Sequence, residues 1–185
     1  NKLWGIKIVV ATIPALFIGF FIYEYLIDYL RNIFIIAWSS IIFGIILFLV
    51  DTKMHSKKRW EDLNLWEALF VGIFQVLAFI PGASRAGVTI TGARILNIKR
   101  DSAAIFSMLL SIPIIIASIA LVLIDIYTLN GIEIDLLGPL LAAVVSFITA
   151  LVSIHFMMKI LQHTNFNIFI IYRIFLGITL LLIYA

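Results

Sequence analysis

Long apolar stretches without a charged side chain constrain this sequence more than any other feature. One of them, IFIIAWSSIIFGIILFLV at residues 33–50, carries no charge at all. A helix needs about 20 apolar residues to cross a hydrocarbon core of roughly 30 Å. The stretches that meet this requirement are 6–23, 33–50, 103–124, 136–158 and 168–184. The pattern therefore predicts a chain that crosses a membrane several times.

The composition excludes most other classes of protein. Hydrophobic residues make up 64% of the 185 residues and charged residues only 12%, whereas ordinary globular domains have roughly 45–50% and about 25%. A soluble fold of this size cannot hide so much apolar surface. The chain has no cysteine, so disulfides and thiolate metal sites are excluded. A formal charge of +3 on so apolar a chain favours lipid headgroups, and not nucleic acid, as partners.

The basic residues indicate which connecting segments face the cytoplasm. The segment 51–64 holds four lysines and arginines, whereas the segment 24–32 holds one and the segment 125–135 holds none. The positive-inside rule places the first segment inside and the other two outside. Lys99 and Arg100 form a further basic pair, which the alternation of the later helices also places inside.

The segment 65–98 lies between these two basic clusters and is too short for two crossings. Residues 65–80 would rise only roughly 24 Å as a helix, and Pro81 and Gly82 then interrupt the apolar run. The pattern predicts a re-entrant hairpin: a half-helix in, an irregular tip at mid-membrane, and a half-helix out. Non-helical backbone at that depth is tolerated only where it is buried in protein or lines a cavity.

The expected fold is therefore an all-α, polytopic transmembrane helical bundle with a re-entrant helix–loop–helix hairpin. We expect one transmembrane domain over residues 1–185, with the hairpin at about 65–98. The tip of the hairpin is the candidate site on geometry alone.

Arg85 is the strongest single indication of chemistry at this tip. A charge at mid-membrane depth costs several kcal/mol and is a functional hypothesis by default. Ser84 can cap the following helix, whose N–H groups would then face the same cavity. Thr89 lies one turn further on, on the same helical face as Arg85. A guanidinium, two hydroxyls and a helix N-terminus suit a phosphate or carboxylate better than a cation.

Structural roles for the charged residues stay open at this point. Arg85 could pair with a buried carboxylate such as Glu67, or extend its charge to the membrane surface. Arg173 in the last apolar stretch has two comparable roles, a structural partner within the protein or a contact to a lipid phosphate. No zinc-ligand spacing, phosphate-binding loop or dinucleotide-binding glycine pattern occurs in the sequence.

The stretch 67–117 resembles the second signature region of the undecaprenyl-diphosphatases, also called the bacitracin-resistance protein family. PGASRAG at 81–87 stands where that family has a proline-glycine-x-serine-arginine-serine-glycine core, followed by a threonine two residues on. FSMLLSIP matches the family's next helix, and IYRI around Arg173 matches its last. Ala86 replaces the usual second serine. The similarity in order and spacing runs from about Lys7 to the end of the sequence.

The resemblance implies a multi-pass enzyme of the bacterial cytoplasmic membrane, built from inverted repeats with two re-entrant hairpins; this chain would hold one of them. The implied reaction removes a phosphate from a C55 polyprenyl diphosphate, which recycles the lipid for peptidoglycan synthesis and confers bacitracin resistance. Carried over by position, the expected catalytic residues are Ser84, Arg85 and Thr89. Arg85 would clamp the diphosphate, Ser84 would be the nucleophile or a donor to the phosphate, and Thr89 would bond a phosphate oxygen. Gly82 would join Ser84 and Arg85 in binding the substrate.

One departure from the family pattern concerns the metal. The family's first signature, a glutamate-rich stretch ending in a serine-serine-threonine-glycine-histidine block, has no counterpart in this sequence. Those glutamates are thought to hold the divalent metal or to move the proton. The resemblance therefore implies Mg²⁺ or Ca²⁺ as cofactor, with its ligands outside these 185 residues.

The same departure allows more than one expectation for the function of this chain. The sequence, which opens at Asn1, is expected to be a C-terminal portion that is inactive on its own. The alternative functions are a lipid-phosphate transporter or flippase on the same scaffold, and an inactive remnant. The oligomeric state is left open.

The predicted hairpin can be tested by cysteine labelling, because the chain has no cysteine of its own. Ser56→Cys and Asp101→Cys flank the hairpin, and both should react with an impermeant maleimide only from the cytoplasmic side. A control, Asn130→Cys, should react only from the outside. Labelling of the first two positions from opposite sides would exclude the hairpin.

Overall fold

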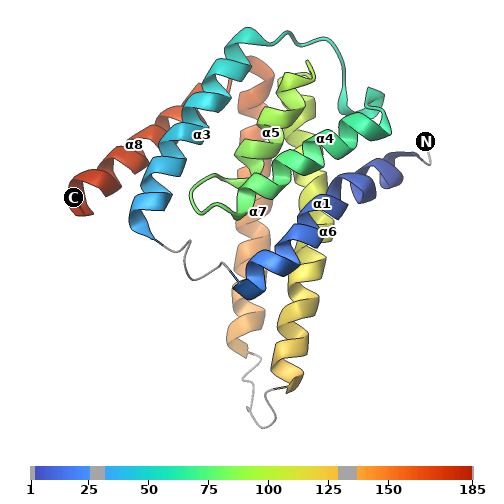
Figure 1. Cartoon of the computed structure of the whole chain (residues 1–185), viewed down its shortest axis with the longest axis vertical. Coiled ribbons are helices and arrows are strands. Elements are labelled where there is room, and N and C mark those ends of the chain that lie inside the picture. The colour runs from blue at the N-terminus through green and yellow to red at the C-terminus, as the bar shows by residue number, and fades with distance from the viewer. Residues whose placement is uncertain (1–2, 26–31, 129–136, 185) are drawn as a thin grey trace.

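The computed structural model describes residues 3–25, 32–128 and 137–184, and within these ranges its regular elements are all helices (Figure 1). In chain order they are α1 (Leu3–Tyr25), α3 (Ile33–Lys53), the short 3₁₀ helix η1 (Trp60–Asp62), α4 (Leu65–Val76), the 3₁₀ helix η2 (Leu77–Phe79), α5 (Arg85–Ile95), α6 (Arg100–Thr128), α7 (Leu137–His163) and α8 (Asn167–Tyr184). The predicted all-α fold is confirmed.

Several helices have the length and composition of membrane spans. Among the described residues these are α3, α6 over Arg100–Ile124, α7 over Leu137–Leu161, and α8. The apolar helices Leu3–Gly19 and Leu65–Phe79 are shorter. The apolar window of α7 has no buried residue, as expected for a helix whose surroundings are lipid. The predicted outer segments 24–32 and 125–135 lie largely outside the described residues.

Local sequence explains where α4 begins and where it stops. Asn64 accepts the N–H of Glu67 at 2.9 Å, and the carboxylate of Glu67 accepts the N–H of Asn64 at 2.9 Å, which together form a capping box. At its other end α4 passes into η2 and then into Pro81 and Gly82. Gly82 has φ +89°, a conformation that glycine adopts without the steric cost other residues incur. These residues turn the chain back into α5.

Two pairs of helices cross closely through glycines. A Cβ placed on Gly72 would lie 2.2 Å from the carbonyl oxygen of Ala11, and one on Gly177 would lie 2.7 Å from that of Ala37. Small residues allow membrane helices to approach in this way. Figure 1 shows the resulting pairs, α1 beside α4 and α3 beside α8, with α5 between them.

The two ends of the α4–α5 hairpin lie side by side. The N–H of Lys99 donates to the carbonyl of Lys58 at 2.9 Å, and the N–H of Lys57 donates to that of Asn97 at 2.9 Å. The chain therefore enters and leaves the hairpin at the same end of the molecule, where α3 ends and α6 begins. We call this the basic end; it carries Lys53, Lys57, Lys58, Arg59, Lys99 and Arg100.

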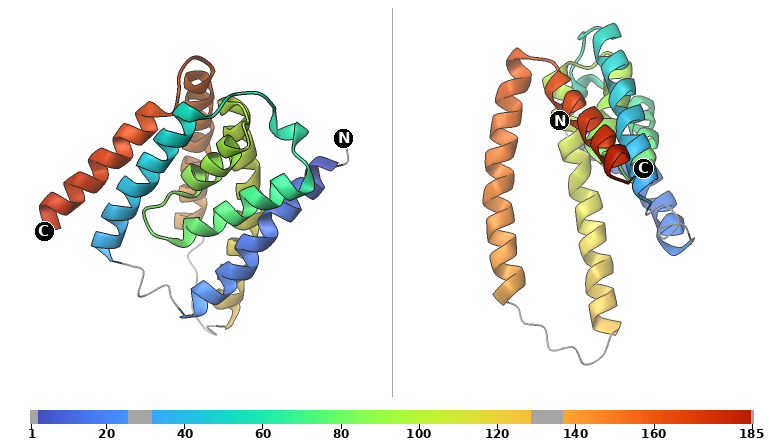
Figure 2. Two further views of the ribbon diagram at one scale, coloured as in Figure 1. Left: turned by 45° about the horizontal axis from the view of Figure 1, so that its top comes forward. Right: turned by 90° about the vertical axis from the view of Figure 1, so that its left-hand side faces the viewer.

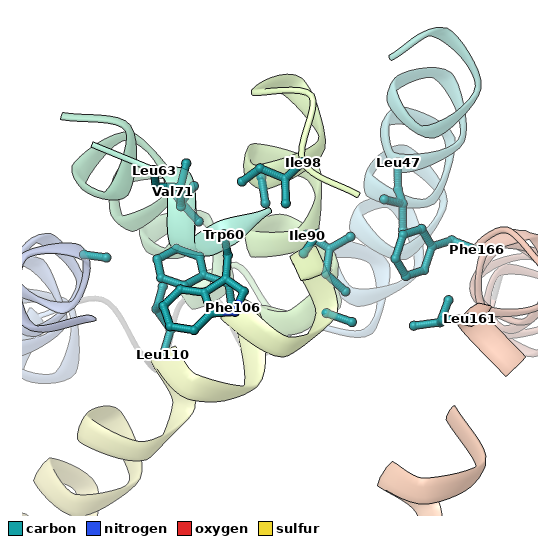
Figure 3. Close-up of a cluster of buried hydrophobic side chains, with 14 of the residues drawn as sticks. Leu47, Trp60, Leu63, Val71, Ile90, Ile98, Phe106, Leu110, Leu161 and Phe166 are labelled. Atoms are coloured by element: carbon teal, nitrogen blue, oxygen red, sulfur yellow. The ribbon is translucent and has the colours of Figure 1, made fainter. Parts of the chain in front are cut away.

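The apolar core lies close to the basic end, around η1 and the first turns of α6 (Figure 3). Trp60 is 5% exposed and stacks on Phe106 with a ring-centroid distance of 5.7 Å. Its backbone N–H donates to the hydroxyl of Ser102 at 2.8 Å. In the second view of Figure 2, α6 and α7 extend away from this core, beyond the other helices. The core thus fixes the base of the hairpin relative to α6.

The close crossing of α1 and α4 predicts a large cost for a single methyl group. Gly72→Ala should lower the free energy of unfolding by about 1–3 kcal/mol, because the added Cβ meets backbone and not a movable side chain. Gly5→Ala is the control, since nothing lies within 4 Å of its Cβ position, and it should gain stability through helix propensity. Thermal unfolding in detergent would measure both. Equal stability of the two variants would contradict the crossing.

Candidate functional site

The carbonyl groups at the tip of the hairpin are satisfied by side chains of α3 and α8. Ser39 donates its hydroxyl to the carbonyl of Pro81, and Ser40 donates to that of Gly82 at 3.2 Å. Arg173 Nη2 donates to the carbonyl of Gly82 at 3.0 Å and to that of the next residue at 2.7 Å. Inside a bilayer each of these groups would otherwise cost several kcal/mol. The tip is therefore held between two membrane-spanning helices.

Gly82 has a structural reason to be a glycine. A Cβ at this position would lie 2.2 Å from Ser39 Oγ and 2.4 Å from the carbonyl oxygen of Ile36. Its positive φ adds a second requirement. Gly82 was predicted to take part in substrate binding, and its carbonyl is bonded to Ser40 and Arg173. Its contribution is to let the tip approach α3.

Ser84 occupies the N-cap of α5 in an unusual backbone conformation. It has φ +65° and ψ 112°, and a non-glycine residue held in such a region stores about 1–3 kcal/mol of strain. Its hydroxyl accepts the N–H of Gly87 at 3.2 Å, and its side chain is exposed. The backbone N–H groups of Arg85 and Ala86, in the first turn of α5, have no partner within the helix. Strain of this kind is typical of functional positions.

Arg85 and Thr89 are joined through Ser107 of α6. Arg85 Nη1 donates to the carbonyl of Ser107 at 3.2 Å, and the hydroxyls of Thr89 and Ser107 lie 2.7 Å apart. Thr89 is fully buried, and its hydroxyl also bonds the carbonyl of Arg85 at 2.9 Å. The structure therefore brings Ser84 and Arg85 together at the tip, but places the Thr89 hydroxyl beneath them. Ser107 lies in the FSMLLSIP motif, and its place in that motif is the sequence feature that could have indicated it as a site residue.

Arg173 is a second cationic residue at the tip, and sequence analysis left its role open. It is 8% exposed, and its Nη2 bonds to the tip carbonyls make it a structural partner within the protein. Its Nη1 is buried without a hydrogen-bond partner, and an unpaired buried donor costs about 1–3 kcal/mol. A Cβ placed on Gly87 would lie 2.5 Å from this atom, so Nη1 lies against the first turn of α5.

The tip thus gathers several features that attract an anion. Arg85 and Arg173 both border the first turn of α5, where the helix dipole is positive and N–H groups are free. Within the described part of the chain neither arginine forms an ion pair. An arrangement of two guanidinium groups and free N–H groups fits the several oxygens of a phosphate group.

The alternative in which Glu67 neutralises Arg85 is wrong. Glu67 lies in the first turn of α4, at the opposite end of that helix from the tip. Its carboxylate pairs with Lys58 and closes the capping box with Asn64. Glu67 therefore belongs to the base of the hairpin.

A second charged cluster, at the base of the hairpin, was missed by the sequence analysis. Arg94 Nε donates to Asp51 Oδ1 at 2.9 Å, and Arg100 Nε donates to the same oxygen at 2.9 Å. Arg94 is fully buried and also bonds Ser56 Oγ at 3.0 Å and the carbonyl of Met54 at 2.9 Å. The cluster joins the end of α3 to the end of α5 and the start of α6. The signal that could have indicated it is a charge, Arg94, inside an otherwise uncharged segment.

The base cluster predicts a large effect of one amide substitution. Asp51→Asn leaves two guanidinium groups without a counter-charge, and removal of one partner of a buried pair costs about 3–5 kcal/mol. Glu67→Gln is the matched control, because its partly exposed pair with Lys58 is worth about 1 kcal/mol or less and glutamine also serves in a capping box. Unfolding in detergent compares them. Similar losses would show that the base cluster does not support the hairpin.

The tip offers few of the ligands that a divalent cation needs. Among the described residues no group of three or more histidine, aspartate or glutamate side chains could hold a metal ion. Mg²⁺ and Ca²⁺ take carboxylate and carbonyl oxygens, and the tip carbonyls are already bonded to Ser39, Ser40 and Arg173. The described residues therefore do not fit the implied cation.

The fold and the tip define a helical membrane protein in which a hairpin between spanning helices presents a cationic site. The sequence matches the family described as Bacitracin resistance protein BacA over residues 1–179. The chain belongs to this family, and it is a multi-pass membrane protein.

Curated relatives support the same assignment. The chain is 38% identical to the undecaprenyl-diphosphatase of Ruegeria sp. (strain TM1040), an alignment that covers 97% of this chain and 67% of the relative. It is 37% identical to the undecaprenyl-diphosphatase of Jannaschia sp. (strain CCS1), over 95% of this chain and 66% of the relative. The corresponding protein of Alteromonas mediterranea is 37% identical, over 94% and 65%. The chain spans about two thirds of the length of the relatives it matches.

Proposed function

We propose that this chain carries the diphosphate-binding part of an undecaprenyl-diphosphatase of the bacterial cytoplasmic membrane. The proposed reaction cleaves the terminal phosphoanhydride bond of undecaprenyl diphosphate with water, giving undecaprenyl phosphate and inorganic phosphate. The returned lipid would serve peptidoglycan synthesis, and its faster return would confer bacitracin resistance. The observation that carries the proposal is the meeting of Arg85, the buried free Nη1 of Arg173 and the N-terminus of α5 at one tip.

The roles of the side chains follow from where their donors lie. Arg85 has one N–H group committed to the carbonyl of Ser107, and its remaining donors are free to bind phosphate oxygens. Arg173 Nη1 and the free N–H groups of α5 would hold charge that develops on the leaving phosphate. Donors fixed in a site with little water stabilise such charge without reorganising. The rigid attachment of the tip to α3 and α8 supplies that fixed geometry.

Ser84 and Thr89 take different positions in this proposal. The hydroxyl of Ser84 is exposed beside the free N–H groups and can approach a phosphorus atom as nucleophile or donate to a phosphate oxygen. Thr89 is buried and bonded to Ser107, so we assign it a positioning role: it fixes α6 against α5 and thereby orients Arg85. Mg²⁺ or Ca²⁺ is the proposed cofactor, with its ligands outside the described residues.

The Arg85 assignment predicts a specific loss of activity. Only a guanidinium offers a planar fork to two phosphate oxygens, so Arg85→Lys should keep the fold and lower phosphate release about 10²–10³-fold, which corresponds to roughly 3–4 kcal/mol. The assay uses the complete reading frame in proteoliposomes with undecaprenyl diphosphate. Ser84→Ala should cost a comparable factor if Ser84 is the nucleophile, and much less if it only donates a hydrogen bond.

Two controls separate catalysis from stability. Arg59→Lys changes an exposed arginine at the basic end and should leave the rate unchanged, and Ala86→Ser restores the usual family residue and should change little. Thermal stability is measured on the same preparations. An Arg85→Lys protein that is folded and fully active would end the clamp proposal. Movement of intact lipid diphosphate across the bilayer without phosphate release would instead favour the transporter alternative.

A further inference from the structure

A polar pocket of about 670 Å³ opens at the basic end, away from the tip. It lies where the loop after α3, the start of α6 and the connection between α7 and α8 meet. Its polar lining consists of Ser56, Lys99, Arg100, Asp101, Thr164 and Asn165. None of these residues takes part in the proposed phosphatase site.

The hydrogen bonds already made around this pocket determine what remains for a ligand. Arg100 uses Nε and Nη2 on Asp51, which leaves Nη1 without a partner among the described residues. The exposed ammonium of Lys99 has none there either. The hydroxyl of Ser56 accepts from Arg94, so its own proton is free to donate. Asn165 accepts the N–H of Asn167 with its side-chain oxygen Oδ1, and its side-chain NH₂ group remains free.

Acceptors are far fewer than donors in this pocket. The hydroxyl of Thr164 already donates to the carbonyl of Ile160 at 2.9 Å, so it can only accept. Asp101 contributes the one carboxylate of the lining. Behind the wall, two guanidinium groups share the single carboxylate of Asp51. The pocket and its wall therefore carry an excess of one positive charge, and four donor groups from three segments line it.

From this donor set we propose that the pocket binds a phosphate-bearing anion, supplied by the headgroup of an anionic phospholipid or as free phosphate. A phosphate offers several acceptor oxygens, which four separate donors can share, whereas one carboxylate offers only two. The volume exceeds that of a phosphate group, and Leu161 adds an apolar wall suited to a glycerol or acyl segment. Basic pockets between membrane helices at the cytoplasmic surface are suited to lipid headgroups in this way.

The proposal is tested by ligand-dependent stability of the purified chain in neutral detergent. Phosphatidylglycerol or inorganic phosphate is titrated while Tm is followed, with phosphatidylcholine and chloride at matched ionic strength as references. A ligand that binds only the folded state raises Tm with concentration. Lys99→Gln should weaken the apparent affinity roughly tenfold, as expected for loss of a charged hydrogen bond, and Asp101→Asn should strengthen it.

Control variants assign the effect to this pocket. Lys57→Gln removes an exposed lysine of the basic end that does not line the pocket, and it should leave the affinity within about twofold. A rise in Tm with phosphatidylglycerol alone identifies the lipid as the source, and a rise with inorganic phosphate identifies the free ion. The proposal is overturned if neither ligand raises Tm, if Lys57→Gln acts as strongly as Lys99→Gln, or if only Arg85→Lys weakens binding, which would place the phosphate at the tip.

Discussion

The structure depends on satisfying a few backbone carbonyls where the hairpin turns between membrane helices. Without water, a turn of this kind would leave the groups at Pro81 and Gly82 unpaired, at a cost of several kcal/mol each. The hydroxyls of α3 and the guanidinium of Arg173 remove that cost. The same contacts turn the carbonyls toward α3 and α8, which leaves the free N–H groups of α5 to define the site. Side chains of other helices thus bind the carbonyl groups of the tip and leave its N–H groups free.

The hairpin is fixed at both of its ends, by different chemistry at each. At the tip the contacts are neutral hydroxyls and one arginine, whereas at the base Asp51 binds both Arg94 and Arg100. Two fixed ends allow the strained conformation of Ser84 to persist, since the surrounding structure over-determines it. Fixed donors near the tip also require little reorganisation when charge develops on a bound group.

The sequence was sufficient for the parts of the fold that follow local rules. Uncharged apolar runs predicted the all-α fold, and the segment 81–85 combined a helix breaker, a cap and a charge in five residues. Those are the residues that the structure places at a turn between two short helices. Arg85 and Ser84 could be named because the pattern around them is contiguous.

The partners of the tip could not be predicted from local patterns. Ser39 and Ser40 look like ordinary small residues in an apolar run, and they contact residues 42 positions away. The same applies to Asp51, whose partner Arg94 lies 43 positions further on. Pairings of this range are set by how the helices pack. A charge or hydroxyl in an apolar segment indicates that a partner exists, but not which one.

The position of Arg173 in the last helix has a consequence for how the protein is made. It lies 91 residues after Gly82, whose carbonyl it binds. At a synthesis rate of about 5–20 residues per second, the tip exists for several seconds before its main donor leaves the ribosome. During that interval Ser39 and Ser40 are already available for the carbonyls of Pro81 and Gly82, whereas the carbonyl of Ala83, which Arg173 binds, needs water or the membrane-insertion machinery as a temporary partner. The cationic site is therefore complete only after α8 has been translated, about 90 residues later than the tip itself.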